Sequence, residues 1–356
     1  MSAVIRNGGP WQDTEGKRMH AQFPHILYHE GKYYLYGSNK EFSNGTTGIW
    51  HWGIRMYESS DLCSWKDLGL IIAPDEKDKD SLLYPGRTVD APCIIYNVKT
   101  QKWVCWMIDM SQMKAFTLVS DSLFGPYVVS SDLFFPCDLP IGDFDLMQTE
   151  DGKGYIYFNC PHTKIVCAEL TEDFTGVTGR YTTTLHHPES VPFSREAPAH
   201  FCRDGKHYLI TSGTTAFFPN PSEVAVSQSP MGDFQVLGDP HAGDPSKTSF
   251  HSQVRSVFKH PHKKDLYIAL ADRWLPQYMH LPYEVYKEWF RIWFHDRKEE
   301  LLDRVKREGE EYQVKQFSEE QDVSLAEYVV LPIVFDGDRV TIAWRDAWSP
   351  NEFDDE

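Results

Sequence analysis

The stretch RDGKHYLITSG, residues 203–213, indicates the fold because its pattern returns along the chain. It is a turn with Asp, Gly and Lys, followed by a short run of aromatic and β-branched residues, which is typical of a strand entered through a tight turn. The four other copies are HEGKYYLYGS from His29, KTQKWVCWMID from Lys99, EDGKGYIYFN from Glu150 and HKKDLYIALAD from His262. Each copy predicts a turn that leads into an inner strand of a repeated sheet.

A second unit lies between these copies and carries Ser, Asp and an aromatic residue. Its copies are ESSDLCSWKDLG from Glu58, VSDSLFGPYVV from Val119, the looser AELTEDFTGV from Ala168 and VSQSPMGDFQVLG from Val226. We interpret it as the outer hairpin of the same element, so that both units recur about every 50 residues or somewhat more. Four-stranded sheets at this period indicate a propeller, and five copies indicate five blades. The prediction is an all-β fold, one five-bladed β-propeller domain over residues 1–356.

The strand pattern is interrupted near the C-terminal end. Residues 283–318 are highly charged, nearly free of Gly and Pro, and carry apolar residues at helical spacing, such as Val285, Trp289, Ile292 and Trp293. This pattern predicts an amphipathic helical insertion in the last blade. The run from Tyr328, YVVLPIVFDGDRVTIAWRDAW, returns to strand pattern and should complete that blade.

Composition restricts the class of partner. The 356 residues are 41% hydrophobic and 14% aromatic, and 52 acidic against 35 basic residues give a formal net charge of −17. Such a charge repels phosphate backbones and anionic membrane surfaces, so neither nucleic acid nor a membrane is expected as a partner. A neutral oligosaccharide or polysaccharide fits better, because aromatic rings offer flat apolar faces to sugars.

Cysteine usage and the first residues bear on localisation. The seven cysteines are scattered, odd in number and set mostly among apolar neighbours, which favours reduced packing residues and hence the cytoplasm. The start, MSAVIRNGGPWQDTEG, lacks the apolar segment of a secretory signal. The expectation is a cytoplasmic protein, with a secreted protein whose signal was removed as the alternative.

Three carboxylates stand ahead of strands in successive blades. They are Glu196 in SREAPAHFC, Asp143 in IGDFDLMQ and Asp90 in VDAPCIIY. Because inner strands of a propeller converge on its axis, we expect the three to share one pocket. Mutual repulsion and burial would raise the pKa of at least one of them, and hydrolysis of a glycosidic bond needs such a protonated acid. Asp145, two residues after Asp143, is the alternative candidate for the carboxylate of this blade.

These segments resemble glycoside hydrolase family 43, and most closely its exo-β-1,3-galactanase branch. The resemblance rests on WQDTEGKRMHAQFPHILYHEGKYYLYG from Trp11, on SREAPAHFCRDGKHYLITSGTTAFFPN, and on TSFHSQVRSVF followed by LYIALADRW. It covers nearly the whole chain outside the helical insertion. It implies that Glu196 is the general acid and that Asp143 tunes the pKa of Glu196 and orients it.

The resemblance also implies that the usual general base is missing. The family carries an Asp in an Asp-Pro-x-Ile step, and the matching step here is Phe23-Pro24-His25-Ile26. The galactanase branch also lacks this Asp and is thought to use the Gln of a Ser-Gln step, which here is Gln253. Gln253 would position the attacking water. Inverting chemistry would then place the acid and base groups roughly 6.5 to 9.5 Å apart.

Further positions follow from the same comparison. A Glu of the galactanase branch aligns with Asp90, which is the fourth expected catalytic residue. At another position where the branch has an acidic residue, this sequence has Ser38. The expected substrate-binding residues are Thr215, Arg273, Trp274, His51, Trp52 and Asp145. Neither HExxH nor a paired CxxC spacing is present, so we assign no metal ligand and expect no required cofactor. A structural calcium or other ion in the central channel is compatible with the family.

The resulting hypothesis is an inverting, exo-acting glycoside hydrolase for β-1,3-linked galactose in arabinogalactan-type substrates. An α-L-arabinofuranosidase or β-xylosidase on the same fold is the first alternative, although such enzymes normally keep the first-blade Asp. A catalytically silent carbohydrate-binding propeller is the second, because the base is missing, and a scaffold for protein partners is the third. Simpler roles also stay open: Glu196 could pair with Arg195, Asp90 could be a turn residue, and Gln253 could only hydrogen-bond the sugar.

Overall fold

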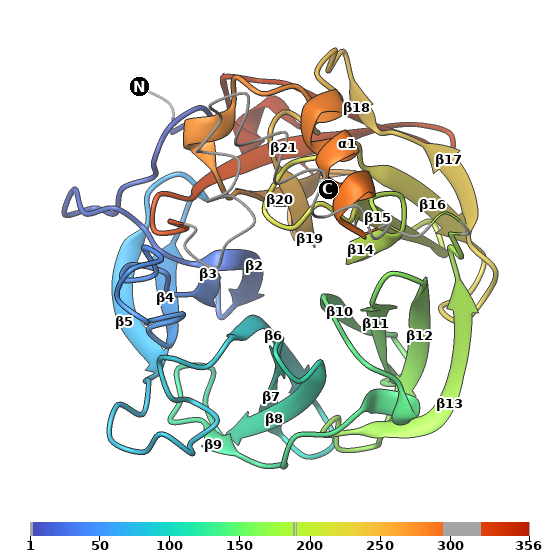
Figure 1. The fold of residues 1–356 in the computed structure, drawn as a ribbon. Helices are drawn as coiled ribbons and strands as arrows, with labels where there is room; N and C mark the ends of the chain where they lie inside the picture. The colour runs from blue at the N-terminus through green and yellow to red at the C-terminus, as the bar shows by residue number, and fades with distance from the viewer. Residues whose placement is uncertain (1–2, 188, 190, 295–321, 356) are drawn as a thin grey trace.

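Five antiparallel sheets surround a central axis in the computed structural model, which describes residues 3–187, 189, 191–294 and 322–355 (Figure 1). The first blade contains β2 (Gln22–His29), β3 (Lys32–Ser38), β4 (Ile54–Ser59) and β5 (Lys66–Ile72). The second contains β6 (Val89–Asn97), β7 (Lys102–Asp109), β8 (Lys114–Ser120) and β9 (Val128–Val129). The third contains β10 (Phe144–Gln148), β11 (Gly154–Cys160), β12 (Lys164–Leu170) and β13 (Val177–Thr184). The fourth contains β14 (Arg195–Arg203), β15 (Lys206–Gly213), β16 (Glu223–Ser227) and β17 (Gln235–Gly238).

The fifth blade closes the ring. It contains β19 (Gln253–Lys259), β20 (Tyr267–Arg273), β21 (Glu327–Asp336) and β22 (Arg339–Ala343), with β18 (His241–Ala242) added in parallel to β22. Near the two ends of the chain, β1 (Ile5–Arg6) pairs with β23 (Ala347–Trp348). Short 3-10 helices span Pro136–Asp138, Pro276–Tyr278 and Pro350–Glu352. The predicted five-bladed propeller is therefore confirmed.

The repeated turn occupies a different place in the blade from the one expected. The aromatic run after each turn forms the second strand, namely β3, β7, β11, β15 and β20, and the innermost strand precedes the turn. The prediction of an inner strand after the turn was wrong, because both strands are buried and an apolar run alone does not distinguish them. The Ser- and Asp-containing unit does join the third and fourth strands of the first four blades, as an outer hairpin should.

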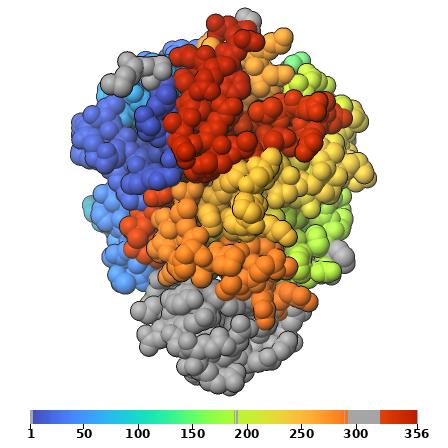
Figure 2. Space-filling model, turned by 90° about the horizontal axis from the view of Figure 1, so that it is seen from above, coloured from blue at the N-terminus to red at the C-terminus, as the bar shows by residue number. Residues whose placement is uncertain are grey.

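The insertion between β20 and β21 begins with a helix, as predicted. Helix α1 spans Tyr283–Phe294, and the remainder of the predicted segment, 295–318, lies outside the described residues. Tyr286 and Phe290 are buried and pack against Phe218 of the fourth blade, with ring centroids 5.3 and 6.4 Å apart. Figure 2 shows the orange segment that contains this helix on one face of the molecule. Among the described residues, no helix is long and apolar enough to cross a membrane.

Three innermost strands begin with the same backbone distortion. The register of β2, β6 and β14 shifts directly after Gln22, Asp90 and Glu196, and each bulge is followed by a residue whose φ lies between 49 and 58°. Bulges of this kind re-aim side chains and are common beside active sites. They place these three side chains at equivalent points of the blades. Asp143 instead lies immediately before β10, which has no such shift in register.

Candidate active site

Glu196 is the second residue of β14 and is half-buried. The amide Nε2 of Gln253, the first residue of β19, donates a hydrogen bond to Glu196 Oε1 at 3.3 Å. Arg195 extends from the other face of the strand, where its guanidinium donates to the hydroxyl and carbonyl oxygens of Thr211. Glu196 is therefore not paired with its neighbour.

The surroundings of Glu196 favour its protonated form. Burial raises the pKa of Glu196 well above its usual range, and the negative charge of Asp143 raises it further. The charges of Arg255 and Arg195 and the hydrogen bond from Gln253 act in the opposite direction but do not outweigh them. A carboxyl group that keeps its proton near neutral pH is what general acid catalysis requires.

Asp143 is held by a buried arginine. Its Oδ2 lies 2.9 Å from Nη1 of Arg255, and the two residues are 9% and 2% exposed. The Arg255 guanidinium also lies over the ring of Phe23, 4.4 Å from the ring centroid. Because this pair is close to Glu196, it sets the charge that the acid experiences.

The amide of Gln253 has a fixed orientation. Besides its contact with Glu196, Nε2 donates to Ser212 Oγ at 2.8 Å, and Oε1 accepts from the indole Nε1 of Trp274 at 3.2 Å. The 3.3 Å contact with Glu196 is far shorter than the expected separation of acid and base, roughly 6.5 to 9.5 Å. That spacing is not found here, since water cannot lie between two groups that already share a hydrogen bond. A water-positioning Gln253 remains a prediction, and it requires the two side chains to separate when substrate enters.

The position of the missing base is apolar. Phe23 is buried, its ring meets Trp274 edge to face at 5.0 Å, and its backbone N–H donates to Asp272 Oδ2 at 2.8 Å. No carboxylate replaces the family's Asp at this point of β2.

Asp90 belongs to a buried ion pair rather than standing as a free carboxylate. Its Oδ1 lies 2.6 Å from Lys40 Nζ, and its Oδ2 accepts from the indole Nε1 of Trp50 at 2.6 Å. Lys40 and Asp90 are 1% and 2% exposed. Burial raises the pKa of Asp90 and lowers that of Lys40, while each charge opposes the shift of the other. Asp90 therefore anchors Lys40 and Trp50 beside the axis.

Asp272 is a carboxyl group that the sequence analysis missed. It is fully buried, it contributes to the wall of the pocket, and its Oδ1 has no hydrogen-bond partner among the described residues. Burial raises the pKa of Asp272 to about 8, and the negative charge of Asp90 adds to the shift. The available signal was the alternation of side chains at the end of β20, which sends Asp272 and Arg273 to opposite faces. Trp274, the next residue, lines the same pocket as Asp272.

The pocket next to these groups is lined with aromatic side chains. The pocket is narrow: the space between its walls reaches about 310 Å³ only together with the open solvent in front of them. Its walls contain Ala216, Phe217, Phe218, Pro219, His251, Ser252, Gln253, Asp272, Trp274, Leu275, Tyr278 and Met279. The Phe217 ring lies 5.0 Å from that of Trp274 and 6.4 Å from that of Trp50. These faces suit the stacking of a sugar ring.

Two of the residues predicted to bind substrate, Thr215 and Arg273, make hydrogen bonds to neighbouring loops. The hydroxyl of Thr215 donates to the Phe218 carbonyl at 2.6 Å and accepts from the Asn220 amide at 2.7 Å. Arg273 pairs with Glu327 at 3.4 Å and donates to the backbone behind the pocket. Both are buried, and neither contributes to the pocket wall described above.

In the IWHWG segment, the predicted residues His51 and Trp52 contact other parts of the first blade and its loops. The Nδ1 of His51 accepts from the Gly53 N–H at 3.1 Å, and its Nε2 faces the Tyr84 carbonyl at 3.2 Å. Trp52 packs against Phe42, with ring centroids 5.0 Å apart. Trp50 is the member of this segment that meets Asp90 and the aromatic pocket.

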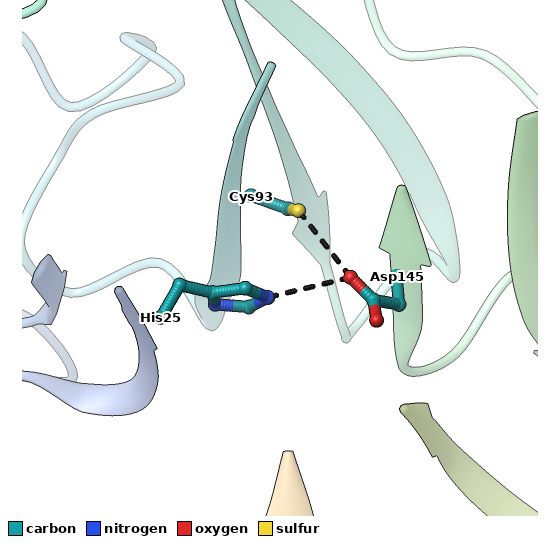
Figure 3. A group of neighbouring side chains, drawn as sticks. All are labelled: His25, Cys93 and Asp145. Carbon is teal, nitrogen blue, oxygen red and sulfur yellow. Dashed lines mark hydrogen bonds and ion pairs between the residues drawn. The ribbon is translucent and has the colours of Figure 1, made fainter. Parts of the chain in front are cut away.

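Asp145 lies in a separate cluster with His25 and Cys93 (Figure 3). Its Oδ1 is 3.5 Å from His25 Nε2 and 3.7 Å from Cys93 Sγ, and its Oδ2 accepts from the His200 N–H at 2.8 Å. Burial alone would lower the pKa of His25, but Cys93 and Asp145 raise it to about 10. Asp143, and not Asp145, is therefore the carboxylate beside Glu196.

Comparison with known proteins defines the family. The model of glycosyl hydrolases family 43 matches residues 18–274. The chain belongs to glycoside hydrolase family 43. No curated protein sequence matches it. The family assignment is consistent with the propeller and with a carboxyl group held protonated at the axis.

Solved structures of the family share this architecture. A family 43 β-1,3-galactosidase superposes with a TM-score of 0.77 at 25% identity over 98% of this chain, which spans 64% of the length of that protein. A second β-1,3-galactosidase, solved with galactodeoxynojirimycin, gives 0.73 at 23% identity, with 97% and 100% of the two chains covered. An exo-β-1,3-galactanase from Phanerochaete chrysosporium, solved with β-1,3-galactotriose, gives 0.76 at 18% identity, with 98% and 68% covered.

Proposed function

We propose that this family 43 glycoside hydrolase removes terminal galactose from β-1,3-linked galactans with inversion at the anomeric carbon. The observation that carries the proposal is a carboxyl group, Glu196, whose pKa is raised by burial and by Asp143 and which is hydrogen-bonded to Gln253 in the wall of an aromatic pocket. The choice of sugar is supported by the structural neighbours, which are described as β-1,3-galactosidases or a β-1,3-galactanase.

In this proposal Glu196 gives its proton to the glycosidic oxygen as the bond breaks. Asp143 keeps that proton in place before reaction, and Arg255 balances the charge of Asp143. Trp274 and Phe217 supply the apolar faces against which the galactose ring packs. Gln253 positions the water once the incoming sugar separates its amide from Glu196. Attack by this water on the opposite face of the ring gives inversion, and the proton that the water loses passes to the nitrogen of Gln253 in its imidic tautomer. Exchange with solvent then returns a proton to Glu196 and removes one from Gln253.

The test is release of galactose from β-1,3-galactobiose, compared with aryl arabinofuranosides and aryl xylosides. We expect galactose release by the wild type and loss of at least about a hundredfold in Glu196→Gln, because proton transfer contributes about 10²- to 10⁴-fold. Glu223→Gln is the matched control, since Glu223 lies on the same blade, 3.9 Å from Arg195, and should keep its activity. The anomer formed first, followed by NMR, tests inversion.

Other outcomes separate the alternatives. Turnover of arabinofuranosides or xylosides alone would assign one of those activities to the scaffold. Sugar binding without turnover, unchanged in Glu196→Gln, would identify a binding propeller. Activity equal in Glu196→Gln and the wild type would contradict the role of the acid.

A further inference from the structure

His25, Cys93 and Asp145 converge from three successive blades onto one point near the axis. They lie on the innermost strands β2, β6 and β10, and their ligand-type atoms are all within 4.8 Å of one another (Figure 3). Each of the three residues is more than nine-tenths buried. None of them contributes to the pocket next to Glu196. The proposed hydrolysis therefore leaves this cluster without a role.

The orientation of His25 directs one ring nitrogen, Nε2, toward the carboxylate of Asp145, whose Oδ1 lies 3.5 Å away. Its Nδ1 lies 3.1 Å from the carbonyl oxygen of Phe23, and since a carbonyl oxygen only accepts, Nδ1 carries a proton. Nε2 faces Cys93 and Asp145, and on binding a cation it would release the proton that the metal-free ring carries there. Nε2 is buried and has no hydrogen-bond partner among the described residues. A histidine fixed in this way, through its other nitrogen, is typical of metal ligands.

We propose that His25 Nε2, Cys93 Sγ and Asp145 Oδ1 bind a thiophilic divalent cation, for which Zn²⁺ is the appropriate probe. Usual bond lengths in a tetrahedral zinc site separate nitrogen from oxygen by about 3.3 Å and sulfur from oxygen by about 3.5 Å. The corresponding distances here are 3.5 and 3.7 Å. The three atoms therefore already approach three corners of such a site, and water would supply the fourth.

The donor set does not suit the calcium ion considered from the sequence. Calcium takes six to eight oxygen ligands, whereas this cluster offers one nitrogen, one sulfur and one carboxylate. The second oxygen of Asp145 is already occupied by the His200 N–H, which holds the carboxylate in its orientation. On binding, the Cys93 thiol would lose its proton to the buffer and bind as the thiolate.

The location favours a structural role for the cation. Asp145 meets β14 at His200, four residues after Glu196, which corresponds to roughly 10–13 Å along the strand. A cation at this place would not touch the reacting bond. It would instead link the first three blades across the axis, so that binding stabilises the folded ring by mass action.

The test uses the full chain, stripped with a chelator and titrated with Co²⁺ and then Zn²⁺. We expect one equivalent of Co²⁺ with tetrahedral d–d bands and a thiolate-to-cobalt charge-transfer band, displacement of Co²⁺ by Zn²⁺, and a higher melting temperature with Zn²⁺. Cys93→Ser should remove the charge-transfer band and weaken binding by at least about tenfold. Cys202→Ser, which changes an exposed free cysteine, is the matched control and should behave like the wild type.

Several results would overturn the proposal. These are no binding by the wild type, a charge-transfer band that survives Cys93→Ser, or a band that disappears in Cys202→Ser. If Cys93→Ser fails to fold by circular dichroism, His25→Gln and Asp145→Asn answer the same question. Unchanged Zn²⁺ affinity in either folded variant would contradict the site.

Discussion

Replacing Asp143 by Asn separates two roles that the structure gives this carboxylate. Asp143 is the counterion of Arg255, at 2.9 Å, and its charge also raises the pKa of Glu196. The Asn side chain keeps the shape of Asp but removes the charge. The substitution should therefore change stability through Arg255 and the pH profile through Glu196.

The stability effect follows from the burial of Arg255. This residue is 2% exposed, and its Nε has no hydrogen-bond partner among the described residues, so Asp143 is its principal compensating charge. Breaking a buried pair by removing one partner costs about 3–5 kcal/mol. We expect Asp143→Asn to lose about that much free energy of unfolding. The double variant Asp143→Asn/Arg255→Met should recover most of it, because no charge is then left unpaired.

The pH effect has a definite sign. Glu196 must be protonated to act, so activity falls as pH rises through the pKa of Glu196. Removing the charge of Asp143 lowers that pKa, and the high-pH limb of kcat/KM moves to lower pH. Arg255→Met moves it to higher pH, because the positive charge of Arg255 lowers the pKa of Glu196. In the double variant, the high-pH limb of kcat/KM should lie between those of the two single variants.

Urea unfolding of the three variants and their pH profiles on an active substrate provide the assay. NMR titration of the Glu196 carboxyl carbon gives the same information independently of turnover. A high-pH limb that stays in place in Asp143→Asn, or moves to higher pH, would refute the electrostatic role of Asp143. Equal loss of stability in the single and double variants would refute the argument from an unpaired Arg255.

Two further predictions concern Asp272 and Asp90, whose partners come from other parts of the chain. The pKa of Asp272 rises from 3.8 to about 8 on folding. Between these two pH values the folded state binds a proton that the unfolded state has lost. The free energy of unfolding therefore falls as pH rises, by up to about 1.4 kcal/mol per pH unit from this group. The free energy of unfolding, measured with urea between about pH 5 and pH 8, should fall less steeply with pH in Asp272→Asn than in the wild type. An unchanged slope would contradict the raised pKa of Asp272. Lys40→Met leaves Asp90 buried without its partner and should cost about 3–5 kcal/mol. Partial recovery in Lys40→Met/Asp90→Asn checks that cause, and no recovery would mean that the packing of Lys40 matters more than its charge.

Local sequence patterns predicted most of the architecture. The turn of residues 203–213 and its copies indicated the number of blades, and helical spacing indicated α1. Such features depend on neighbours in the chain, through turn chemistry and the alternation of side chains. The same patterns did not give the position of a strand within its blade, because the innermost and second strands are buried alike.

Which polar side chains lie together near the axis depended on contacts between blades. Nothing near Asp145 in the sequence indicates that it meets His25 and Cys93, which lie 120 and 52 positions earlier in the chain. Lys40 was not predicted at all, since a lysine that is 1% exposed is recognisable only once its partner Asp90 is known.

The position of Glu196 was predictable because it stands shortly before a recurring turn, and its role as the acid was implied by the resemblance to family 43. Its protonation, by contrast, depends on Asp143 one blade away and on Gln253 in the next blade. The sequence by itself determined a propeller and predicted a carboxyl group, Glu196, at its axis. Only the tertiary structure decided which charges surround that acid, because the energies of burial and charge pairing depend on distances between residues that are far apart in the chain.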